Sequence, residues 1–247
     1  MGDVKKILIA KDGHVFYVKD LEQDFHNQFG LISAKDLQKK DGSIVASNKG
    51  EEFVLTTPKF IDIYHRLGRG AQLITLKDIG EIITETGLGK EDLAVDCGAG
   101  SGGLACYLAF VCKKVVSYDI RKDHLEYVEK NMKMLGLTNY ELKNMDVYEK
   151  IEEEDVDVVT IDIPEPWRAA DNAFKALKPG GFLVSYSPSV TQSINMVNKA
   201  IEENKFCHIR TTEVVQRNWD IIDRVAHPKF RDLNHTGFIS FFRKVRA

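Results

Sequence analysis

The chain has 247 residues, of which 43% are apolar and 29% are charged, a composition typical of a folded globular protein. Its 34 basic and 37 acidic residues give a net charge of −3, which disfavours a protein that coats nucleic acid indiscriminately. The longest apolar run, Leu104–Cys112, is too short to span a membrane. Charged residues enclose the apolar stretch near the N-terminus, so we expect neither a membrane nor a secreted protein.

The cysteines agree with a cytoplasmic location. They show no C-x-x-C spacing, so the sequence predicts neither a zinc site nor a redox pair, and we expect small buried side chains. Spacing does not reveal whether a disulfide joins two protomers. The four are Cys97, Cys106, Cys112 and Cys207.

Residues 1–69 are expected to form a small β-rich N-terminal domain with a linker helix. Turn signals such as Asp12-Gly13 separate short β-prone segments, as in hairpins. The predicted linker helix begins at Pro58 and ends near Leu67. The predicted strands are Lys5–Ala10, His14–Lys19, Ser43–Ala46 and Glu52–Thr56.

Residues 70–247 alternate between helical and strand patterns. This alternation predicts an α/β fold, a Rossmann-like doubly wound sheet with helices on both faces. The predicted strands are Leu93–Val95, Lys114–Tyr118, Tyr140–Leu142, Val156–Ile161, Phe182–Tyr186, His208–Val215 and Gly237–Phe242. The predicted helices are Lys77–Glu85, Gly102–Cys112, one bearing Leu125, Val128, Met132 and Leu135, Arg168–Leu177, and one from Val190 to Ile201. A turn is expected at Lys178–Gly181.

A glycine-rich loop lies between the first predicted strand of this region and the following helix. Gly98, Gly100 and Gly103 satisfy G-x-G-x-x-G, in which backbone can approach a ligand closely at a helix N-terminus. The pattern alone does not separate a dinucleotide from S-adenosylmethionine.

Acidic residues near three strand ends favour S-adenosylmethionine. Asp119 follows Gly98 by 21 residues, a position from which a carboxylate reaches ribose hydroxyls. Asp146 is placed to accept from an adenine amine, and Asp96 is able to hold the ammonium group of the methionine part. Such a row of acids would repel the pyrophosphate of NAD.

The fourth strand end carries a rigid acidic segment, Asp162-Ile163-Pro164-Glu165-Pro166-Trp167. Each of its two prolines fixes its own backbone conformation and limits that of the preceding residue, which keeps the segment extended. Asp162 is therefore expected to point into the crevice at the carboxyl ends of the strands. A fixed carboxylate with the aromatic plane of Trp167 suits gripping a heterocyclic base by its edge and its face.

These residues resemble the class I S-adenosylmethionine-dependent tRNA (adenine-N1)-methyltransferases, which modify position 58 of the T-loop and, in some archaeal members, also position 57. The similarity spans about residues 65–247. Further matching segments are Lys77-Asp78, Tyr186-Ser187-Pro188 with Gln192, Ala226-His227-Pro228 and His235-Thr236-Gly237-Phe238. The sequence departs from the family at Thr75-Leu76, where members often carry Tyr-Pro or Tyr-Ser, so an aromatic that could shape the target pocket is missing.

The resemblance implies the roles of the site residues. Asp162 and Tyr186 are the candidate catalytic residues, the first on the N6 amine and the second stacking on the adenine. The candidate cofactor-binding residues are Asp96, Gly98, Gly100, Ser101, Gly102, Gly103, Leu104, Asp119, His124, Asp146, Val147 and Asp162. No metal is expected, because Cys207, His208, His227 and His235 fit no common ligand spacing.

A basic C-terminal region is the candidate contact for tRNA phosphates. The resemblance also implies a homotetramer, which would combine the basic faces of several copies. The candidate cations are Arg217, Arg224, Lys229, Arg231, Arg243, Lys244 and Arg246, together with Lys59, Arg66 and Arg69.

Three other functions stay open at this point. The first is a methyltransferase that acts on a small molecule or a protein, and the second is a non-catalytic tRNA-binding subunit. The third is an NAD-dependent oxidoreductase, which is disfavoured because no acid/base His or Tyr-x-x-x-Lys pair flanks the crevice.

Overall fold

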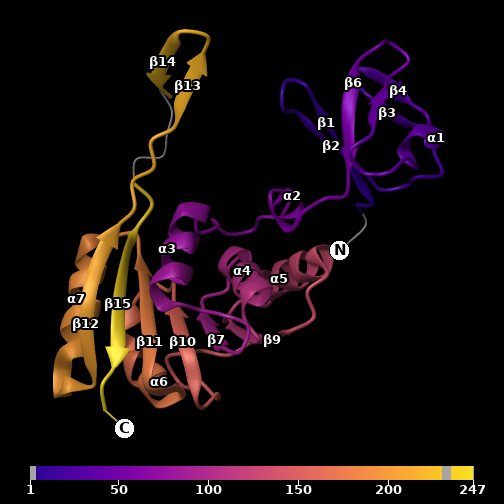
Figure 1. Ribbon diagram of the computed structural model, residues 1–247. Coiled ribbons are helices and arrows are strands. Elements are labelled where there is room, and N and C mark those ends of the chain that lie inside the picture. Colours follow the sequence, from indigo (N-terminus) through magenta and orange to yellow (C-terminus); the bar gives the residue numbers. More distant parts are fainter. Residues whose placement is uncertain (1–3, 230–234, 247) are drawn as a thin grey trace. The chain divides into compact units, whose positions relative to one another are not determined.

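The computed structural model describes residues 4–229 and 235–246 (Figure 1). The chain divides into two compact units, Met1–Leu67 with Asn131–Gly136, and Gly68–Lys130 with Leu137–Ala247. Within the described residues, no helix has both the length and the apolarity that a membrane crossing requires.

A four-stranded antiparallel sheet in the order β2-β1-β6-β5 forms the centre of the smaller unit. Gly13, with φ +88°, forms the turn between β1 and β2, as the Asp-Gly signal predicts. Aromatic side chains pack edge to face over this sheet, and Phe16 contacts both Phe29 and Phe53. The strands are β1 (Lys6–Ala10), β2 (Val15–Val18), β5 (Ile44–Ala46) and β6 (Glu52–Thr56), which confirms the four predicted segments.

Shorter elements of this unit escaped sequence analysis. Strands β3 (Phe25–Asn27) and β4 (Gly30–Ile32) are too short to show a period of two, and α1 (Ala34–Leu37) is a single turn. The Ser33 hydroxyl caps that turn by accepting from Asp36 N. The predicted linker helix is shorter than expected, because α2 spans only Phe60–Tyr64.

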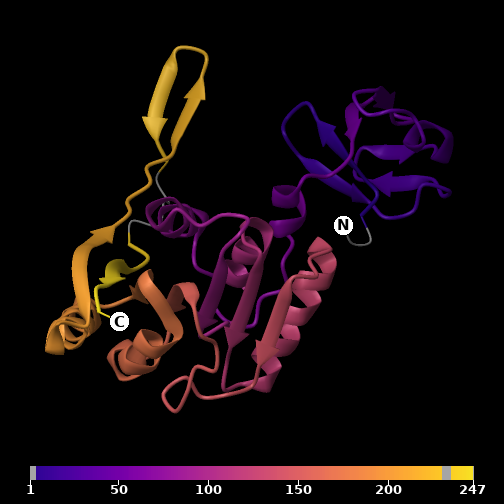
Figure 2. The ribbon, with the colours of Figure 1, turned by 60° about the horizontal axis from the view of Figure 1, so that its bottom comes forward.

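The larger unit contains a seven-stranded sheet in the order β12-β15-β11-β10-β7-β8-β9 (Figures 1 and 2). Strands β11, β10, β7, β8 and β9 run parallel, and β15 is antiparallel to both of its neighbours. The doubly wound prediction is therefore confirmed. The bounds are β7 (Leu93–Cys97), β8 (Lys114–Tyr118), β9 (Tyr140–Lys143), β10 (Val156–Ile161), β11 (Leu177–Ser187), β12 (Phe206–Glu213) and β15 (Phe238–Lys244).

Strand order reverses between β7 and β10, because the chain builds β8 and β9 on one side of β7 and then crosses to β10 and β11 on the other. Ligands of open α/β folds bind at the carboxyl ends of the strands beside such a reversal. The residues that follow β7 and β10 are the glycine loop and Asp162.

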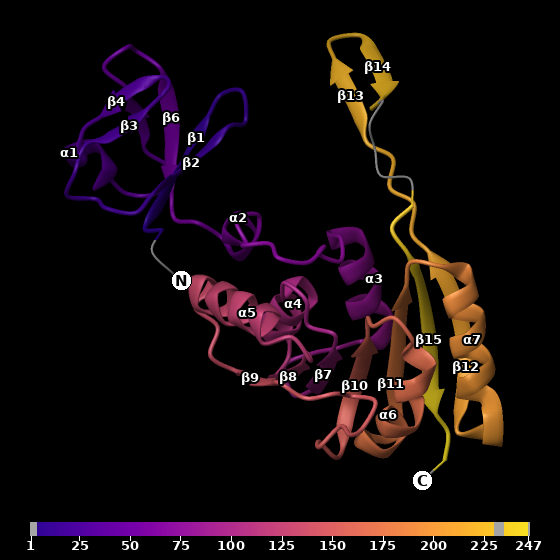
Figure 3. The same cartoon turned by 180° about the vertical axis from the view of Figure 1, so that it is seen from behind.

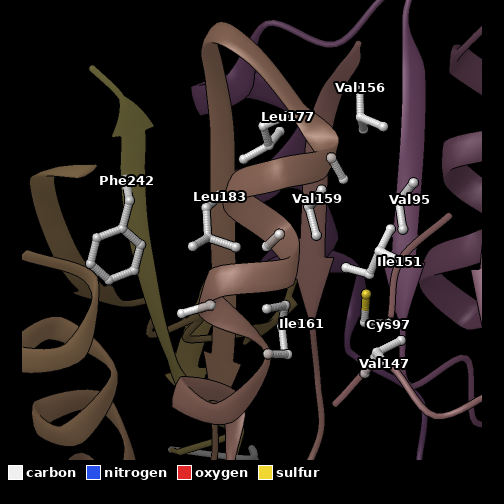
Figure 4. Close-up of a cluster of buried hydrophobic side chains, with 14 of the residues drawn as sticks. Val95, Cys97, Val147, Ile151, Val156, Val159, Ile161, Leu177, Leu183 and Phe242 are labelled. Atoms are coloured by element: carbon white, nitrogen blue, oxygen red, sulfur yellow. The ribbon is translucent and has the colours of Figure 1, made fainter. Parts of the chain in front are cut away.

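Helices cover both faces of the large sheet. Helix α4 packs on β7 and β8, and α6 and α7 pack on β11 (Figure 3). Apolar side chains of β7, β10 and β11, such as Val95, Val159 and Leu183, form the core beneath α6 (Figure 4). The helices are α3 (Leu76–Thr86), α4 (Gly103–Val111), α5 (Lys122–Leu135), α6 (Ala170–Ala176) and α7 (Val190–Ile201), with 3₁₀ turns η1 (Pro166–Ala169) and η2 (Glu202–Asn204).

Two features of this unit differ from expectation. The predicted turn at Lys178–Gly181 lies inside the long strand β11, where it bulges out between the pairings of Val156 and Val158 with β11. The long connection before β15 contains a hairpin, β13 (Trp219–Ile222) and β14 (Val225–Pro228). Its turn residue Asp223 has φ +52° without a glycine to signal it.

Candidate functional site

The glycine loop follows β7 and brings the ends of two strands into contact. Gly98 has φ +93°, and a Cβ atom built on it would lie 2.1 Å from the carbonyl oxygen of Asp162. The backbone N–H of Asp162 donates to the carbonyl of Cys97 at 2.8 Å, which extends the β7–β10 ladder by one bond. Only a glycine at position 98 allows the two backbones to approach this closely.

A cavity of about 520 Å³ opens at this point, at the carboxyl ends of the parallel strands. Twelve of the thirteen predicted site residues line it, namely Asp96, Gly98, Gly100, Ser101, Gly103, Leu104, Asp119, His124, Asp146, Val147, Asp162 and Tyr186. The exception is Gly102, which was predicted to bind the cofactor and does not line the cavity. A Cβ atom there would lie 3.1 Å from both methyl groups of Val128, so Gly102 allows α4 and α5 to pack closely.

Asp119 ends β8 and is held by its surroundings. One carboxylate oxygen accepts from Gly100 N at 3.0 Å and lies 3.0 Å from His124 Nδ1. The other oxygen accepts from Arg121 N at 2.8 Å. These bonds fix the carboxylate between the glycine loop and the first turn of α5, and they make His124 its orienting partner.

Asp146 lies in the loop after β9, on the wall that also carries Val147. Its Oδ1 accepts from Tyr148 N at 2.8 Å, an Asx turn that orients the carboxyl group. Met145 and Tyr148 line the same wall and were missed by sequence analysis, because neither has a pattern that marks a ligand site.

Asp96 is the most buried acid of the cavity, with 2% of its surface exposed. Its Oδ1 accepts from Thr160 Oγ1 at 3.0 Å, whereas Oδ2 has no hydrogen-bond partner among the described residues. Burial raises the pKa of Asp96 to about 6. A buried carboxylate oxygen without a partner is costly unless a ligand donates to it.

Asp162 stands at the carboxyl end of β10, facing the same cavity. Burial and, to a smaller extent, the negative charge of Asp96 together raise its pKa to about 7. The proline-rich segment that follows is anchored where Gln192 Nε2 donates to Pro164 O at 2.8 Å. A second anchor is Glu165 N, which donates to the Tyr148 hydroxyl at 3.1 Å.

The aromatic side chain that lines the cavity together with Asp162 is Tyr186, and the prediction that Trp167 would face the crevice is wrong. Trp167 is half-buried against the hydrophobic core beneath α6 and does not line the cavity. Tyr186 does line it, and burial raises the pKa of its hydroxyl to about 12. A Cβ atom on Gly237 would lie 2.6 Å from the ring of Tyr186, so backbone packs directly against the phenol.

An irregular segment at the start of the larger unit contributes cavity residues that the sequence did not indicate. Ala71, Gln72, Leu73 and Ile74 line the cavity, although they lie in an irregular stretch without a recognisable motif. Ser101 holds this segment, because its hydroxyl accepts from Gly70 N and donates to the carbonyl of Ala71 at 2.7 Å. The Ser101 hydroxyl is therefore engaged with backbone.

Thr75 and Leu76 do not line the cavity. The Thr75 hydroxyl instead donates to Asp78 Oδ2 at 2.8 Å at the beginning of α3.

Two of the described C-terminal basic residues make contacts within the large sheet. Lys244 is buried and donates to the carbonyl of Leu177, so its prediction as a phosphate contact is wrong. The guanidinium of Arg243 lies 4.1 Å from the ring centroid of Phe182, its cross-strand partner in the middle of β11. Arg231 lies outside the described residues.

Possible metal ligands are dispersed. Among the described residues, no group of three or more His, Cys, Asp or Glu side chains could hold a metal ion. His235 bonds to Glu213 and Pro188, and the Glu213 carboxylate raises its pKa. Cys207 is exposed, and the other three cysteines are buried.

Comparisons with known proteins identify the family. The family model for the tRNA methyltransferase complex GCD14 subunit matches residues 53–243. The tRNA (adenine(57)-N(1)/adenine(58)-N(1))-methyltransferase TrmI of Methanocaldococcus jannaschii is 33% identical, over 96% of this chain and 94% of its own length. This chain belongs to the tRNA methyltransferase family. The tRNA (adenine(58)-N(1))-methyltransferase TrmI of Thermus thermophilus is 31% identical, over 98% of this chain and 93% of its own.

Solved structures share the fold of this tRNA methyltransferase family member. A structure described as an S-adenosylmethionine-dependent O-methyltransferase of Thermotoga maritima superposes with a TM-score of 0.87. It is 26% identical, over 100% of this chain and 95% of that one.

The fold and the family imply S-adenosylmethionine as the methyl donor. The residues around the cavity fit such a group. The unpartnered Asp96 Oδ2 suits an ammonium ion, and the glycine loop lines the cavity with Gly98, Gly100 and Gly103, where backbone can approach a ligand closely.

Proposed function

We propose that this protein transfers the methyl group of S-adenosylmethionine to N1 of adenine 58 in the T-loop of tRNA, with adenine 57 as a second acceptor to be tested. The observation that carries the proposal is that Asp162 and Tyr186 line the same cavity as the glycine loop. The relatives from Methanocaldococcus jannaschii and Thermus thermophilus, which are named for these positions, support the choice of acceptor.

The cofactor side of the cavity consists of acids and backbone. In the proposal, Asp96 binds the ammonium of the methionine part, Asp119 accepts from the ribose hydroxyls, and Asp146 accepts from the adenine amine. His124 orients Asp119 through their 3.0 Å contact. The remaining proposed contacts are Gly98, Gly100, Ser101, Gly103, Leu104 and Val147.

Bound S-adenosylmethionine supplies a methyl group that its positively charged sulfur already activates. The residues of this chain therefore mainly orient the acceptor, whose N1 has an in-plane lone pair and needs no deprotonation. Methylation makes the adenine ring cationic. The Asp162 carboxylate, hydrogen-bonded to the N6 amine, stabilises this charge as it develops, while Tyr186 stacks on the ring.

A tRNA substrate must present the Watson–Crick edge of adenine, so the target base has to be extruded from its stack. Exposed cations of the larger unit, such as Arg217 and Arg224, are the proposed phosphate contacts. Because the proposed substrate is tRNA, the proposal includes a cytoplasmic location.

A homotetramer is also part of the proposal. The hairpin β13–β14 exposes large apolar side chains, with 51% of Trp219 and 73% of Ile221 accessible. A two-stranded hairpin is marginally stable alone, so contact with another copy would stabilise it. Light scattering during gel filtration should give about four times the monomer mass, and a monomeric mass would refute this part.

Methyl transfer to an unmodified tRNA transcript, followed by nucleoside mapping, tests the main proposal. We expect 1-methyladenosine at position 58, lost when adenine 58 of the transcript is replaced by guanine, and 1-methyladenosine that persists in that transcript would identify adenine 57 as a second acceptor. Asp162→Ala should lower kcat by about a hundredfold to a thousandfold. Its affinity for S-adenosylmethionine should change little. Loss of cofactor affinity with normal turnover at saturation would overturn the role of Asp162.

The same assay separates the other functions. The Thermotoga maritima structure described as an O-methyltransferase favours a second candidate, methyl transfer to a hydroxyl group. That candidate would be supported if the protein methylated small phenols and did not methylate the tRNA transcript. Binding of NAD in place of S-adenosylmethionine would indicate an oxidoreductase, and tRNA binding without transfer would indicate a non-catalytic subunit.

A further inference from the structure

A buried cluster of polar side chains lies behind the acceptor side of the cavity. Asp78, the third residue of α3, is 0% exposed. Its Oδ2 accepts from Thr75 Oγ1 at 2.8 Å and from Thr236 Oγ1 at 2.7 Å, and its Oδ1 accepts from Lys77 Nζ at 2.7 Å. Lys77 Nζ also donates to Thr236 Oγ1 at 2.5 Å. Every member of the cluster is thus hydrogen-bonded to another.

The cluster does more than cap a helix. A Thr–Asp pair at the first turn of α3 would suffice for capping, and an acid there also suits the helix dipole. Here Asp78 also forms a buried ion pair with Lys77, and the two side chains are 0% and 9% exposed. Asp78 accepts in addition from Thr236, which lies 158 residues further along the chain. Burying both charges costs free energy because each loses its hydration. The cost indicates that the hydrogen bonds of this pair have a role beyond stabilising the helix.

Thr236 connects the cluster to Tyr186. Thr236 lines the cavity, whereas neither Lys77 nor Asp78 does. The next residue, Gly237, packs its backbone on the Tyr186 ring, where an added Cβ would lie 2.6 Å from the ring carbon Cζ. The segment that the cluster holds through Thr236 therefore packs against the hydroxyl end of the Tyr186 ring.

We propose that Lys77, Asp78 and Thr236 are positioning residues that hold Tyr186 in the orientation required for stacking on the acceptor adenine. This proposal rests on the proposed function. Lys77 and Asp78 act through Thr236, because neither lines the cavity. A small misplacement of a positioning group lowers the rate of transfer far more than it lowers cofactor affinity.

Thr236→Val tests the proposal, because valine keeps the shape of threonine and removes its hydroxyl. We expect kcat for tRNA methylation to fall by about tenfold to a hundredfold, with the Kd for S-adenosylmethionine within about twofold of the original. Thr236→Ser, which retains the hydroxyl, should keep most of the activity. The matched control is Thr84→Val on the exposed face of α3, where the hydroxyl bonds only within its own helix.

A double-mutant cycle with Tyr186→Ala distinguishes positioning from a general structural role. If Thr236 acts through Tyr186, Thr236→Val should cost nothing further once the ring is absent. Additive losses, or a Thr236→Val enzyme as active as the Thr84→Val control, would refute the positioning role. Thermal melting of every variant shows whether it is folded. If Thr236→Val does not fold, Lys77→Met is the second variant, and we expect the same loss in kcat as for Thr236→Val.

The outcomes also separate this proposal from the proposed function. If the unaltered protein does not methylate tRNA, the proposed function fails and the positioning role fails with it. If the unaltered protein methylates tRNA and Thr236→Val does so equally well, only the positioning role is refuted.

Discussion

Replacing Asp162 by asparagine should make the cofactor-free protein more stable while reducing its activity. The structure gives the reason, since burial and the charge of Asp96 raise the pKa of Asp162 from 3.8 to about 7. Between these two values the folded state holds a proton that the unfolded chain releases. Folding stability therefore falls as the pH rises from about 4 to about 7, and above that the full penalty is present.

The size of the effect follows from the two pKa values. At about 1.4 kcal/mol per pKa unit, the ionised Asp162 would destabilise the fold by about 4 kcal/mol at pH 8 and by about 1.5 kcal/mol at pH 5. Because Asp162 is partly accessible to water, we expect about half of these amounts. For a chain of this size Asp162→Asn should then raise Tm by about 4–8 °C at pH 8, and by about 1–3 °C at pH 5.

Differential scanning calorimetry without cofactor at the two pH values is the assay. The matched control is Glu149→Gln, which removes one negative charge from an exposed loop position and should leave Tm nearly unchanged at both pH values. Equal melting of Asp162→Asn and the original protein at pH 8, or a larger gain at pH 5 than at pH 8, would contradict the reasoning. A gain in stability with a loss in kcat is the pattern expected where an acid is kept buried for function.

Further predictions concern the glycine loop, the cofactor and tRNA. Gly98→Ala should abolish S-adenosylmethionine binding and lower Tm sharply, because its Cβ would lie 2.1 Å from a carbonyl oxygen; Gly13→Ala, with nothing within 4 Å, should lower stability by only about 1 kcal/mol. Asp96→Asn should weaken S-adenosylmethionine binding by about tenfold to a hundredfold in calorimetric titration, and unchanged affinity would exclude the ammonium contact. The affinity for tRNA should fall steeply with salt, and Arg224→Gln should reduce that slope by about one, whereas Arg243→Gln should not. A flat salt response would count against phosphate contacts altogether.

Local sequence patterns determined the alternation of strands and helices and the residues at the strand ends. A glycine loop after a buried strand, and acids after the next strands, are set by neighbours in the chain, so Gly98, Asp119 and Asp162 could be predicted to meet at one edge of the sheet. The bulge in β11 and the glycine-free hairpin turn at Asp223 could not, because backbone conformation there depends on pairing with strands far along the chain.

Only the tertiary structure decided what each side chain faces. Trp167 and Lys244 look in the sequence like a base-binding ring and a phosphate contact, yet one packs against the core and the other bonds a buried carbonyl. Conversely, no sequence pattern connects Asp78 with Thr236. The two residues are 158 positions apart in the sequence, and yet their side-chain oxygens lie 2.7 Å apart. Hydrophobic periodicity specifies which face of an element is buried, and long-range packing then selects which partner fills each position there.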